Sequence, residues 1–137
     1  MAADVLDAHA DVLIIGGGMA ATWSAVGAAK AGASVIVVDK GFVGTSGVTA
    51  TGGPNHWWIA PDAALRRKVI EDRHAAGYGL SDPEWMERVI DTTWRTLPDL
   101  GEHYAFGTDG KGGTFHSGVR GSKYMRALRA YVFSPSM

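Results

Sequence analysis

The chain has 137 residues, of which 46% are apolar and 20% are charged, a composition typical of a globular protein that is long enough for one domain. Its 13 basic and 14 acidic residues leave a net charge of -1 without a basic block, so neither nucleic acid nor an anionic membrane surface is expected as a partner. Cysteine is absent, which excludes disulfides, iron–sulfur ligation and thiol catalysis within this sequence.

Residues 1–10 are predicted to form an N-terminal tail. They include acidic residues but no Lys or Arg, which is the wrong charge for a secretory signal. Wholly apolar runs such as Val12 to Ile15 are far shorter than the roughly 20 residues that cross a bilayer. We therefore expect a cytoplasmic chain without a membrane span.

The first predicted elements form a βαβ unit. Val12 to Ile15 is a short apolar run that ends at three glycines, which is typical of a parallel strand buried on both faces. Met19 to Ala31 is rich in small residues and stops at Gly32, which predicts a helix that lies close to a sheet. Ser34 to Val38 is predicted as a second buried strand, and Asp39 follows its end. The unit takes about 28 residues, near the minimum for a right-handed crossover.

A loop and a charged helix are predicted next. Residues 41–54 are loaded with Gly, Thr and Ser and leave no room for a regular element. Residues 62–76 are predicted to form a surface helix. The run Arg66-Arg67-Lys68 lies among acidic residues, and we expect it on the solvated face of that helix.

Two further helices and a hairpin follow. Ser81 or Asp82 is predicted to cap a helix that has Pro83 in its first turn. The apolar residues of this helix recur at helical spacing and are expected in the core; they are Trp85, Met86, Val89, Ile90, Trp94 and Leu97. The turn-rich residues 107–113 predict a hairpin, and residues 124–132 predict a last amphipathic helix.

The turn after the first strand carries the strongest indication of function. The run Gly16-Gly17-Gly18-Met19-Ala20-Ala21 matches the pattern G-x-G-x-x-G/A. In this pattern the first glycine makes a tight turn, the second lets the backbone approach a pyrophosphate, and the last small residue lets the helix pack on the strand. The helix N-terminus then offers N–H groups and the positive end of its dipole to phosphate.

Asp39 supplies the other half of this pattern. It lies about 20 residues beyond the glycines, where a carboxylate accepts hydrogen bonds from a ribose hydroxyl. Strand, glycine turn, helix and carboxylate together predict a dinucleotide site. The alternative is a glycine turn that merely joins a strand to a helix.

The segment after Asp39 favours FAD over a nicotinamide dinucleotide. A nicotinamide-binding domain would continue directly with another crossover helix and a third apolar strand. Here Lys40 is followed by Thr45-Ser46-Gly47 and then by Thr51-Gly52-Gly53. Glycines let backbone amides come close to a flat ring system, and Thr or Ser hydroxyls can bond to pyrophosphate or to ring nitrogens.

The glycine motif and its surroundings also resemble a known family. The chain is similar to the N-terminus of the succinate dehydrogenase and fumarate reductase flavoprotein family, with its relatives L-aspartate oxidase and the adenylylsulfate reductase flavoprotein, in DVLIIGGGMAATWSAVGAAKAGASVIVVDK and the following GTSGVTATGG. It also resembles the family segment before the next FAD-domain strand in TDGKGGTFHSGVRGSKYMRALRAYV. The resemblance implies an α/β fold: the N-terminal part of an FAD-binding Rossmann-type domain over residues 11–132, followed by an irregular tail, 133–137.

The resemblance implies FAD as the cofactor and hydride transfer between flavin N5 and a substrate carbon. The residues that fall on FAD-contacting positions are Gly16, Gly18, Met19, Ala20, Asp39, Lys40, Thr45, Ser46, Gly47, Thr51, Gly52 and Gly53. Aligning the Gly52-Gly53 pair places Ser46 where membrane-bound members carry a histidine that bonds covalently to the flavin. A serine hydroxyl cannot form that linkage, so we expect FAD to be held non-covalently.

The family's flavoproteins run several times longer than this chain and add a capping domain and further strands. We therefore expect the substrate-binding and proton-delivering residues in that missing part. The predicted function is the FAD-binding portion of a flavin-dependent oxidoreductase, with a complementary chain or self-association as further partners. The alternative is a non-catalytic nucleotide-binding module, or a truncated remnant that acts only with a partner chain.

Two of the histidines are candidate site residues. His56, in a turn with two tryptophans, could contact the flavin, although a histidine in such a turn is more often solvated. His116 with Arg120 could face an anionic substrate, as the resemblance suggests, against the alternative of an exposed hairpin. The remaining histidines have no ligand-like spacing, so no metal site is expected.

Overall fold

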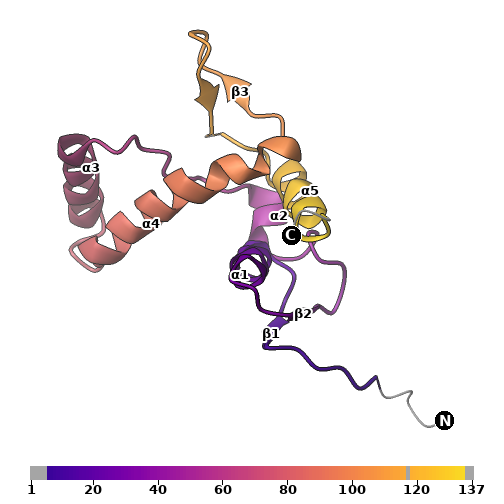
Figure 1. Ribbon diagram of the computed structural model, residues 1–137. Coiled ribbons are helices and arrows are strands. Elements are labelled where there is room, and N and C mark those ends of the chain that lie inside the picture. The colour runs from indigo at the N-terminus through magenta and orange to yellow at the C-terminus, as the bar shows by residue number, and fades with distance from the viewer. Residues whose placement is uncertain (1–5, 117, 135–137) are drawn as a thin grey trace. The chain divides into compact units, whose positions relative to one another are not determined.

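The structure is a computed structural model of the chain and describes residues 6–116 and 118–134 (Figure 1). The chain divides into two compact units. Unit 1 comprises the described residues up to Gly53 and from Arg120 onward, and unit 2 runs from Pro54 to Val119. The glycine motif and Asp39 lie in unit 1.

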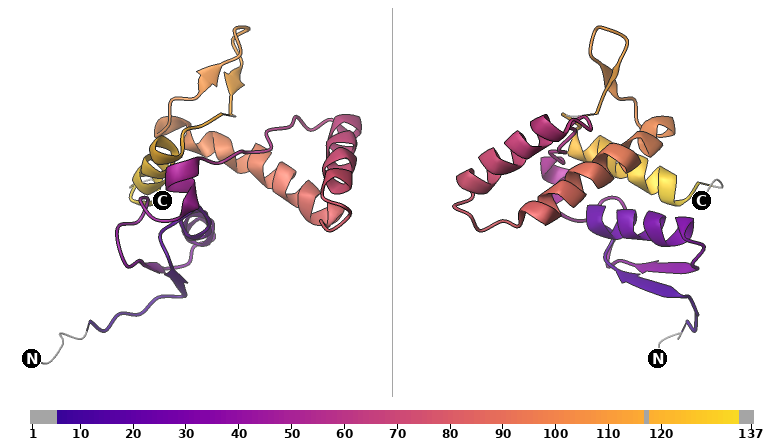
Figure 2. Two further views of the ribbon diagram at one scale, coloured as in Figure 1. Left: turned by 180° about the vertical axis from the view of Figure 1, so that it is seen from behind. Right: turned by 60° about the vertical axis from the view of Figure 1, so that its left-hand side comes forward.

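Unit 1 begins with the predicted βαβ unit. Strand β1 (Val12–Ile15) pairs in parallel with β2 (Val35–Val38), with Val12 opposite Val35 and Ile15 opposite Val38. Helix α1 (Met19–Lys30) connects them and lies along one face of the strand pair (Figure 2). The predicted strand, helix and second strand are therefore confirmed to within one residue at each boundary.

Gly32 ends α1, as its position in the sequence predicts. Its φ of +87° suits a residue without a side chain. Its N–H donates to the carbonyl of Ala29, and the N–H of Ala33 donates to the carbonyl of Ala28. These two bonds satisfy carbonyls of the last turn and turn the chain back toward β2.

The other face of the strand pair is open. Leu13 is 62% exposed, Ile15 is 84% exposed and Val38 is 51% exposed. The prediction that both strands are buried on both faces is therefore wrong for these residues. One helix covers one face of two strands, whereas a buried parallel sheet has helices on both faces and several more strands.

The glycine-rich loop contains a short helix, so the prediction that residues 41–54 leave no room for a regular element is wrong. Helix α2 (Val48–Gly52) lies against helix α5 (Gly121–Val132). A Cβ atom on Gly121 would fall on the carbonyl oxygen of Thr49 and within 2.8 Å of the Cα of Gly53. A helix of one turn is not stable alone, so packing against α5, and not its own composition, stabilises α2.

Helix α5 supplies much of the core of unit 1, which confirms the predicted last amphipathic helix. Tyr124, Met125 and Leu128 are completely buried, and α5 packs on α1 as well as on α2. The indole Nε1 of Trp23 donates a 2.7 Å hydrogen bond to the hydroxyl of Tyr124. Burial raises the pKa of Tyr124 to about 12, with the bond from Trp23 acting in the opposite direction.

Unit 2 contains two predicted helices with acidic caps. Helix α3 (Ala63–Ala76) begins after Asp62, whose carboxylate accepts from the N–H of Leu65. Helix α4 (Pro83–Thr96) begins after Asp82, whose carboxylate accepts from the N–H of Glu84. Both helices are confirmed, and Asp82, not Ser81, is the cap of α4.

A turn of 3-10 helix and a hairpin complete unit 2. The 3-10 helix η1 (Leu97–Glu102) follows α4 directly. Strand β3 (Gly107–Thr108) pairs antiparallel with β4 (Thr114–Phe115), so the predicted hairpin is confirmed.

The apolar stripe of α4 is only partly buried. Ile90 and Leu97 are almost completely buried, and the rings of Trp94 and Trp58 stack with centroids 4.1 Å apart. Trp85, by contrast, is 61% exposed and Val89 is 50% exposed. The predicted apolar stripe is thus wider than the buried surface of α4. The side with Ile90 and Leu97 is buried, whereas the adjacent side with Trp85 and Val89 is exposed.

Arg66 departs from its predicted place on a solvated helix face. It is only 8% exposed, and its guanidinium donates to the carbonyls of Ile59 and Ala60 and to the carboxylate of Asp91. The planar guanidinium offers five N–H donors, enough to join the segment before α3 to α4. Arg67 and Lys68 are exposed as predicted.

Candidate functional site

The glycine turn joins the ends of the two strands. Gly16 has a φ of +111°, which favours glycine, and its N–H donates a 2.7 Å hydrogen bond to the carbonyl of Val38. The carbonyl of Gly17 accepts from the N–H of Gly44, in the loop beyond β2. The turn, the end of β2 and the glycine-rich loop are thus bonded into one structure.

Gly17 is a site residue that the motif did not single out. A Cβ atom there would lie 2.8 Å from the Cα of Val43 and 3.0 Å from the carboxyl carbon of Asp39. Only glycine lets the loop and the carboxylate approach the turn this closely. The one hint in the sequence is that three glycines stand together where the motif requires two.

The N-terminus of α1 is open toward this turn. Gly18 is its N-cap, no side chain caps the helix, and its first turn holds no acidic residue. The N–H groups at a helix start need acceptors and attract an anion. A Cβ atom on Gly18 would lie 3.6 Å from the carbonyl oxygen of Ser46 and 3.7 Å from the Cα of Gly47, so that a larger side chain would fill the space between turn and loop.

Asp39 lies beside the turn and is held by the loop. Its Oδ1 accepts a 2.7 Å hydrogen bond from the hydroxyl of Ser46 and a 2.8 Å bond from the N–H of Gly41. These bonds, the one from Ser46 foremost, lower the pKa of Asp39, and the neighbouring Lys40 acts in the same direction. The carboxylate is therefore ionised and acts only as a hydrogen-bond acceptor at neutral pH.

The other predicted loop residues are more dispersed. Lys40, Thr45, Thr51 and Gly52 are exposed. The hydroxyl of Thr45 donates to the carbonyl of Phe42, and the hydroxyl of Thr51 donates to the carbonyl of Val48. The structure thus brings together the glycine turn, Asp39, Ser46 and Gly47. Lys40, Thr45, Thr51 and Gly52 lie along the outside of the loop. Gly53 instead packs against Gly121 of α5.

Helix α5 supports the loop from behind. The guanidinium of Arg129 donates a 3.0 Å hydrogen bond to the carbonyl of Val43. Gly44 has a φ of +84°, and a Cβ atom there would lie 2.8 Å from the carbonyl oxygen of Met125. These contacts join residues more than 80 positions apart, and no local pattern indicates them.

Met19, a predicted site residue, joins α1 to α2. The hydroxyl of Thr49 lies 3.9 Å from the sulfur of Met19 and donates to it. Ala20 follows Met19 and is exposed in the first turn of α1. Met19 therefore packs within unit 1, whereas Ala20 stays at the open helix start.

His116 lies in an aromatic cluster of unit 2, not in an exposed hairpin. It is 7% exposed, and its ring centroid lies 4.1 Å from that of Trp58 and 4.3 Å from that of Phe106. Burial lowers the pKa of His116, although the backbone of Thr114 opposes the shift. Burial likewise lowers the pKa of His56. A neutral imidazole is a poor partner for an anionic substrate, which weakens that hypothesis for His116.

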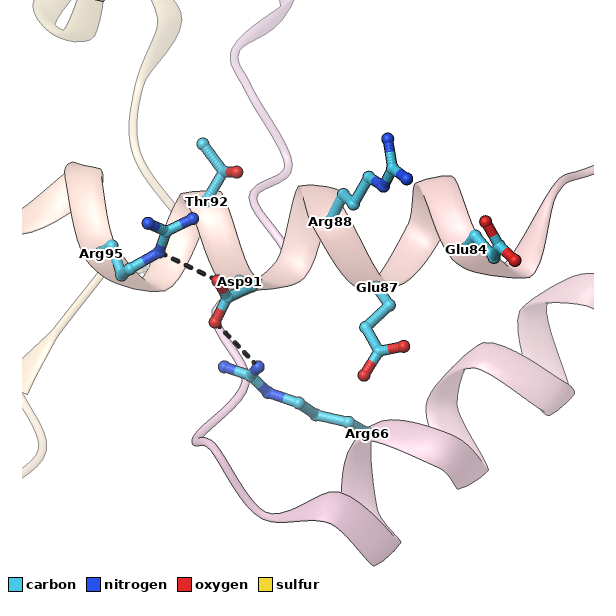
Figure 3. Close-up of a pocket in the computed structure, with 7 residues that line it drawn as sticks. All are labelled: Arg66, Glu84, Glu87, Arg88, Asp91, Thr92 and Arg95. Carbon is cyan, nitrogen blue, oxygen red and sulfur yellow. Dashed lines mark hydrogen bonds and ion pairs between the residues drawn. The ribbon is translucent and has the colours of Figure 1, made fainter.

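A pocket of about 520 Å³ lies between α3 and α4 (Figure 3). Asp91 bridges Arg66 and Arg95 within it, at 3.2 Å and 2.9 Å. Its side chains balance in charge; they are Arg66, Glu84, Glu87, Arg88, Asp91, Thr92 and Arg95. The pocket therefore selects neither an anionic nor a cationic ligand, and we assign it to the packing of the two helices.

The described residues contain neither a cluster of metal-ligating side chains nor a helix that could span a membrane. Within 6–116 and 118–134, three or more metal-ligating side chains do not gather at any point. No helix in the same part of the chain is long and apolar enough to cross a membrane.

The comparisons with known proteins agree with the geometry of unit 1. A family model described as an FAD binding domain matches residues 11–132. No curated protein and no solved structure matches the chain. The matched residues include the glycine turn, the open start of α1 and Asp39, which are the features that a dinucleotide requires. The chain therefore belongs to the FAD-binding-domain family of the succinate dehydrogenase and fumarate reductase flavoproteins.

Proposed function

We propose that unit 1 binds FAD non-covalently and is the cofactor-binding part of a flavin-dependent oxidoreductase. The observation that carries the proposal is the close grouping of the glycine turn, the uncapped start of α1 and the ionised Asp39. The helix start can bind an anion, and the neighbouring carboxylate can accept a hydrogen bond from a hydroxyl. This combination suits a nucleotide with a pyrophosphate and a ribose.

The residues of unit 1 fit the parts of FAD in turn. The first-turn N–H groups of α1 would donate hydrogen bonds to the pyrophosphate, and Gly18 leaves the room that this approach needs. Asp39 would accept hydrogen bonds from a ribose hydroxyl, and Thr45 and the residues from Gly47 to Gly53 would lie against the flavin. When bound, FAD supplies transfer of a hydride at its N5 position.

Non-covalent binding is supported by the chemistry of Ser46. When the Gly52-Gly53 pair is aligned, Ser46 stands where membrane-bound members of the family carry the covalently bonding histidine. Its hydroxyl donates a hydrogen bond to Asp39. We also propose that the substrate is bound with the help of residues outside this sequence. The exposed side chains of Leu13 and Ile15 support this, because helices normally cover both faces of a parallel sheet.

Acid release tests the mode of binding. The purified chain is saturated with FAD, denatured with acid and passed through a filter that retains the polypeptide. We expect all the yellow colour in the filtrate. Flavin that stays with the polypeptide would refute non-covalent binding. Reoxidation of the reduced complex by an acceptor such as fumarate then separates an oxidoreductase from a nucleotide-binding module that lacks redox chemistry.

A substitution tests the phosphate site itself. Gly18→Val should abolish FAD binding, because its side chain fills the space between turn and loop. Gly27→Val is the matched control, since Gly27 lies in the same helix, is exposed and has nothing within 4 Å of its Cβ position. Both variants are compared by FAD fluorescence titration and circular dichroism. Equal affinities in two folded variants would count against the assignment.

A further inference from the structure

Two hydrogen-bond donors converge on one oxygen of the Asp39 carboxylate. The hydroxyl of Ser46 and the N–H of Gly41 both donate to Oδ1, at 2.7 Å and 2.8 Å. The other oxygen, Oδ2, lies over the glycine turn, 3.1 Å from where a Cβ atom of Gly17 would stand. Two bonds to one oxygen fix the rotation of the carboxyl group and leave Oδ2 directed at the turn.

The hydroxyl of Ser46 is committed to this bond. A serine hydroxyl has one proton to donate, so Ser46 cannot donate to a phosphate or a flavin nitrogen while it donates to Asp39. An O–H donor on a carboxylate at this distance is a charge-assisted bond, stronger than a neutral one. Direct contact with FAD, which the resemblance implies for Ser46, is therefore not the role that its geometry favours.

We propose that Ser46 is a positioning residue that orients Asp39 for a ribose hydroxyl. The proposal rests on the proposed function of unit 1 and gives this loop serine a specific task within it. Ser46 is seven residues away along the chain, so the bond also closes the segment between β2 and α2. One hydrogen bond thereby fixes the position of the loop relative to the carboxylate of Asp39.

Other groups around Asp39 act in the same direction but do not replace Ser46. The Gly41 and Gly17 amides and the charge of Lys40 also favour the ionised carboxylate. The nearby guanidinium of Arg129, on α5, donates to the carbonyl of Val43. Removal of the Ser46 hydroxyl should therefore raise the pKa of Asp39 without making the group neutral at pH 7.

The chain contains a matched control for this experiment. Ser34 donates a 2.7 Å hydrogen bond to the carboxylate of Asp11, in the same unit but away from the glycine turn. This bond is the leading cause of the lowered pKa of Asp11. Ser34→Ala thus removes the same kind of bond without touching the proposed site.

The experiment compares the wild-type chain with Ser46→Ala, Ser46→Thr and Ser34→Ala. FAD affinity is measured by fluorescence titration. The carboxyl pKa values of Asp39 and Asp11 are measured by carbon-13 NMR of the ligand-free chain, with Asp39→Asn to assign the signal. We expect Ser46→Ala to weaken FAD about threefold to tenfold, the range of one hydrogen bond, and to raise the pKa of Asp39. Ser46→Thr should restore both, and Ser34→Ala should change only Asp11.

Each other outcome overturns the proposal. Weaker FAD binding with an unchanged Asp39 pKa would show that Ser46 contacts the cofactor directly. A changed Asp39 pKa with unchanged FAD affinity would show that the bond from Ser46 stabilises the loop but does not contribute to FAD binding. A wild-type Asp39 with an ordinary pKa would show that the bond is not formed, even if Ser46→Ala fails to fold. Absence of FAD binding in the wild-type chain would refute the proposed function itself, and the Asp39 titration would still report whether Ser46 holds the carboxylate.

Discussion

At the scale of single residues, hydrogen bonding and burial decide whether a titratable side chain is charged or neutral. Asp39 lies at a loop and is stabilised as an anion by hydrogen bonds. His116 lies among aromatic rings and is stabilised as the neutral form by desolvation. The same physical balance thus keeps a charge in unit 1 and removes one in unit 2.

The burial of His116 predicts a pH dependence of stability. Its pKa is lower in the folded state than the ordinary value of 6.5, so the unfolded chain takes up a proton more readily. Stability should therefore be constant above pH 6.5 and fall as the pH drops below it. Thermal unfolding followed by tryptophan fluorescence at pH 8 and pH 5.5 measures the difference.

Two variants test whether His116 causes this pH dependence of stability. His116→Phe replaces the ring by an uncharged aromatic one and should reduce the loss of stability at pH 5.5. His9→Gln removes an exposed histidine and should leave the loss unchanged. His56, whose pKa burial also lowers, accounts for the part that remains in His116→Phe. Equal losses in His116→Phe and the wild-type chain would contradict the assignment.

At the scale of the elements, helix α5 determines the geometry of the glycine-rich loop. It touches α2 through Gly121 and the loop through Gly44, and Arg129 donates to the loop backbone. The glycines are needed because backbone lies against backbone at both points. The glycine-rich loop is in this way fixed by a helix that follows it by some 70 residues.

The contact at Gly121 predicts a large effect of a small substitution. Gly121→Ala places a methyl group on the carbonyl of Thr49 and should destabilise unit 1 by about 1–3 kcal/mol, the range for overpacking. Gly27→Ala, at an open position of α1, should stabilise it by roughly 0.5–1 kcal/mol, since alanine is the better helix former. Urea unfolding followed by circular dichroism compares the two. A neutral Gly121→Ala would mean that α2 does not rest on α5.

At the scale of the whole molecule, the two-stranded sheet leaves apolar surface and strand edges uncovered. Leu13, Ile15 and Val38 are half or more exposed on it. Unpaired strand edges readily accept another strand, and uncovered apolar faces associate. The 137-residue chain alone should therefore associate at high concentration.

Sedimentation velocity over a range of concentrations tests this association. Ile15→Lys places a charge on the open face and should reduce association, whereas Leu80→Lys, at an equally exposed position in unit 2, should not. FAD in excess should reduce association only in proportion to its affinity, because a ligand stabilises by RT ln(1 + [L]/Kd). A monodisperse wild-type chain that melts cooperatively would contradict the prediction.

Local sequence was sufficient to predict most of the elements. The apolar run from Val12 to Ile15, the stop at Gly32 and the cap at Asp82 act through neighbouring residues, so their outcome follows from short-range physics. The glycine motif and Asp39 were also recognisable, since their spacing reflects a βαβ unit of minimal length. The family was identified from the resemblance of whole segments to known flavoproteins, and the family model over residues 11–132 confirms it.

Tertiary structure alone decided the features that depend on distant contacts. Helix α2 exists against Gly121, Arg66 is buried because carbonyls and Asp91 surround its guanidinium, and His116 is neutral among rings from other segments. The bond from Ser46 to Asp39 likewise requires the loop to fold back on the strand end. Sequence determines these contacts only through the packing of the whole unit, because burial and desolvation are set by which segments meet in space and not by spacing along the chain.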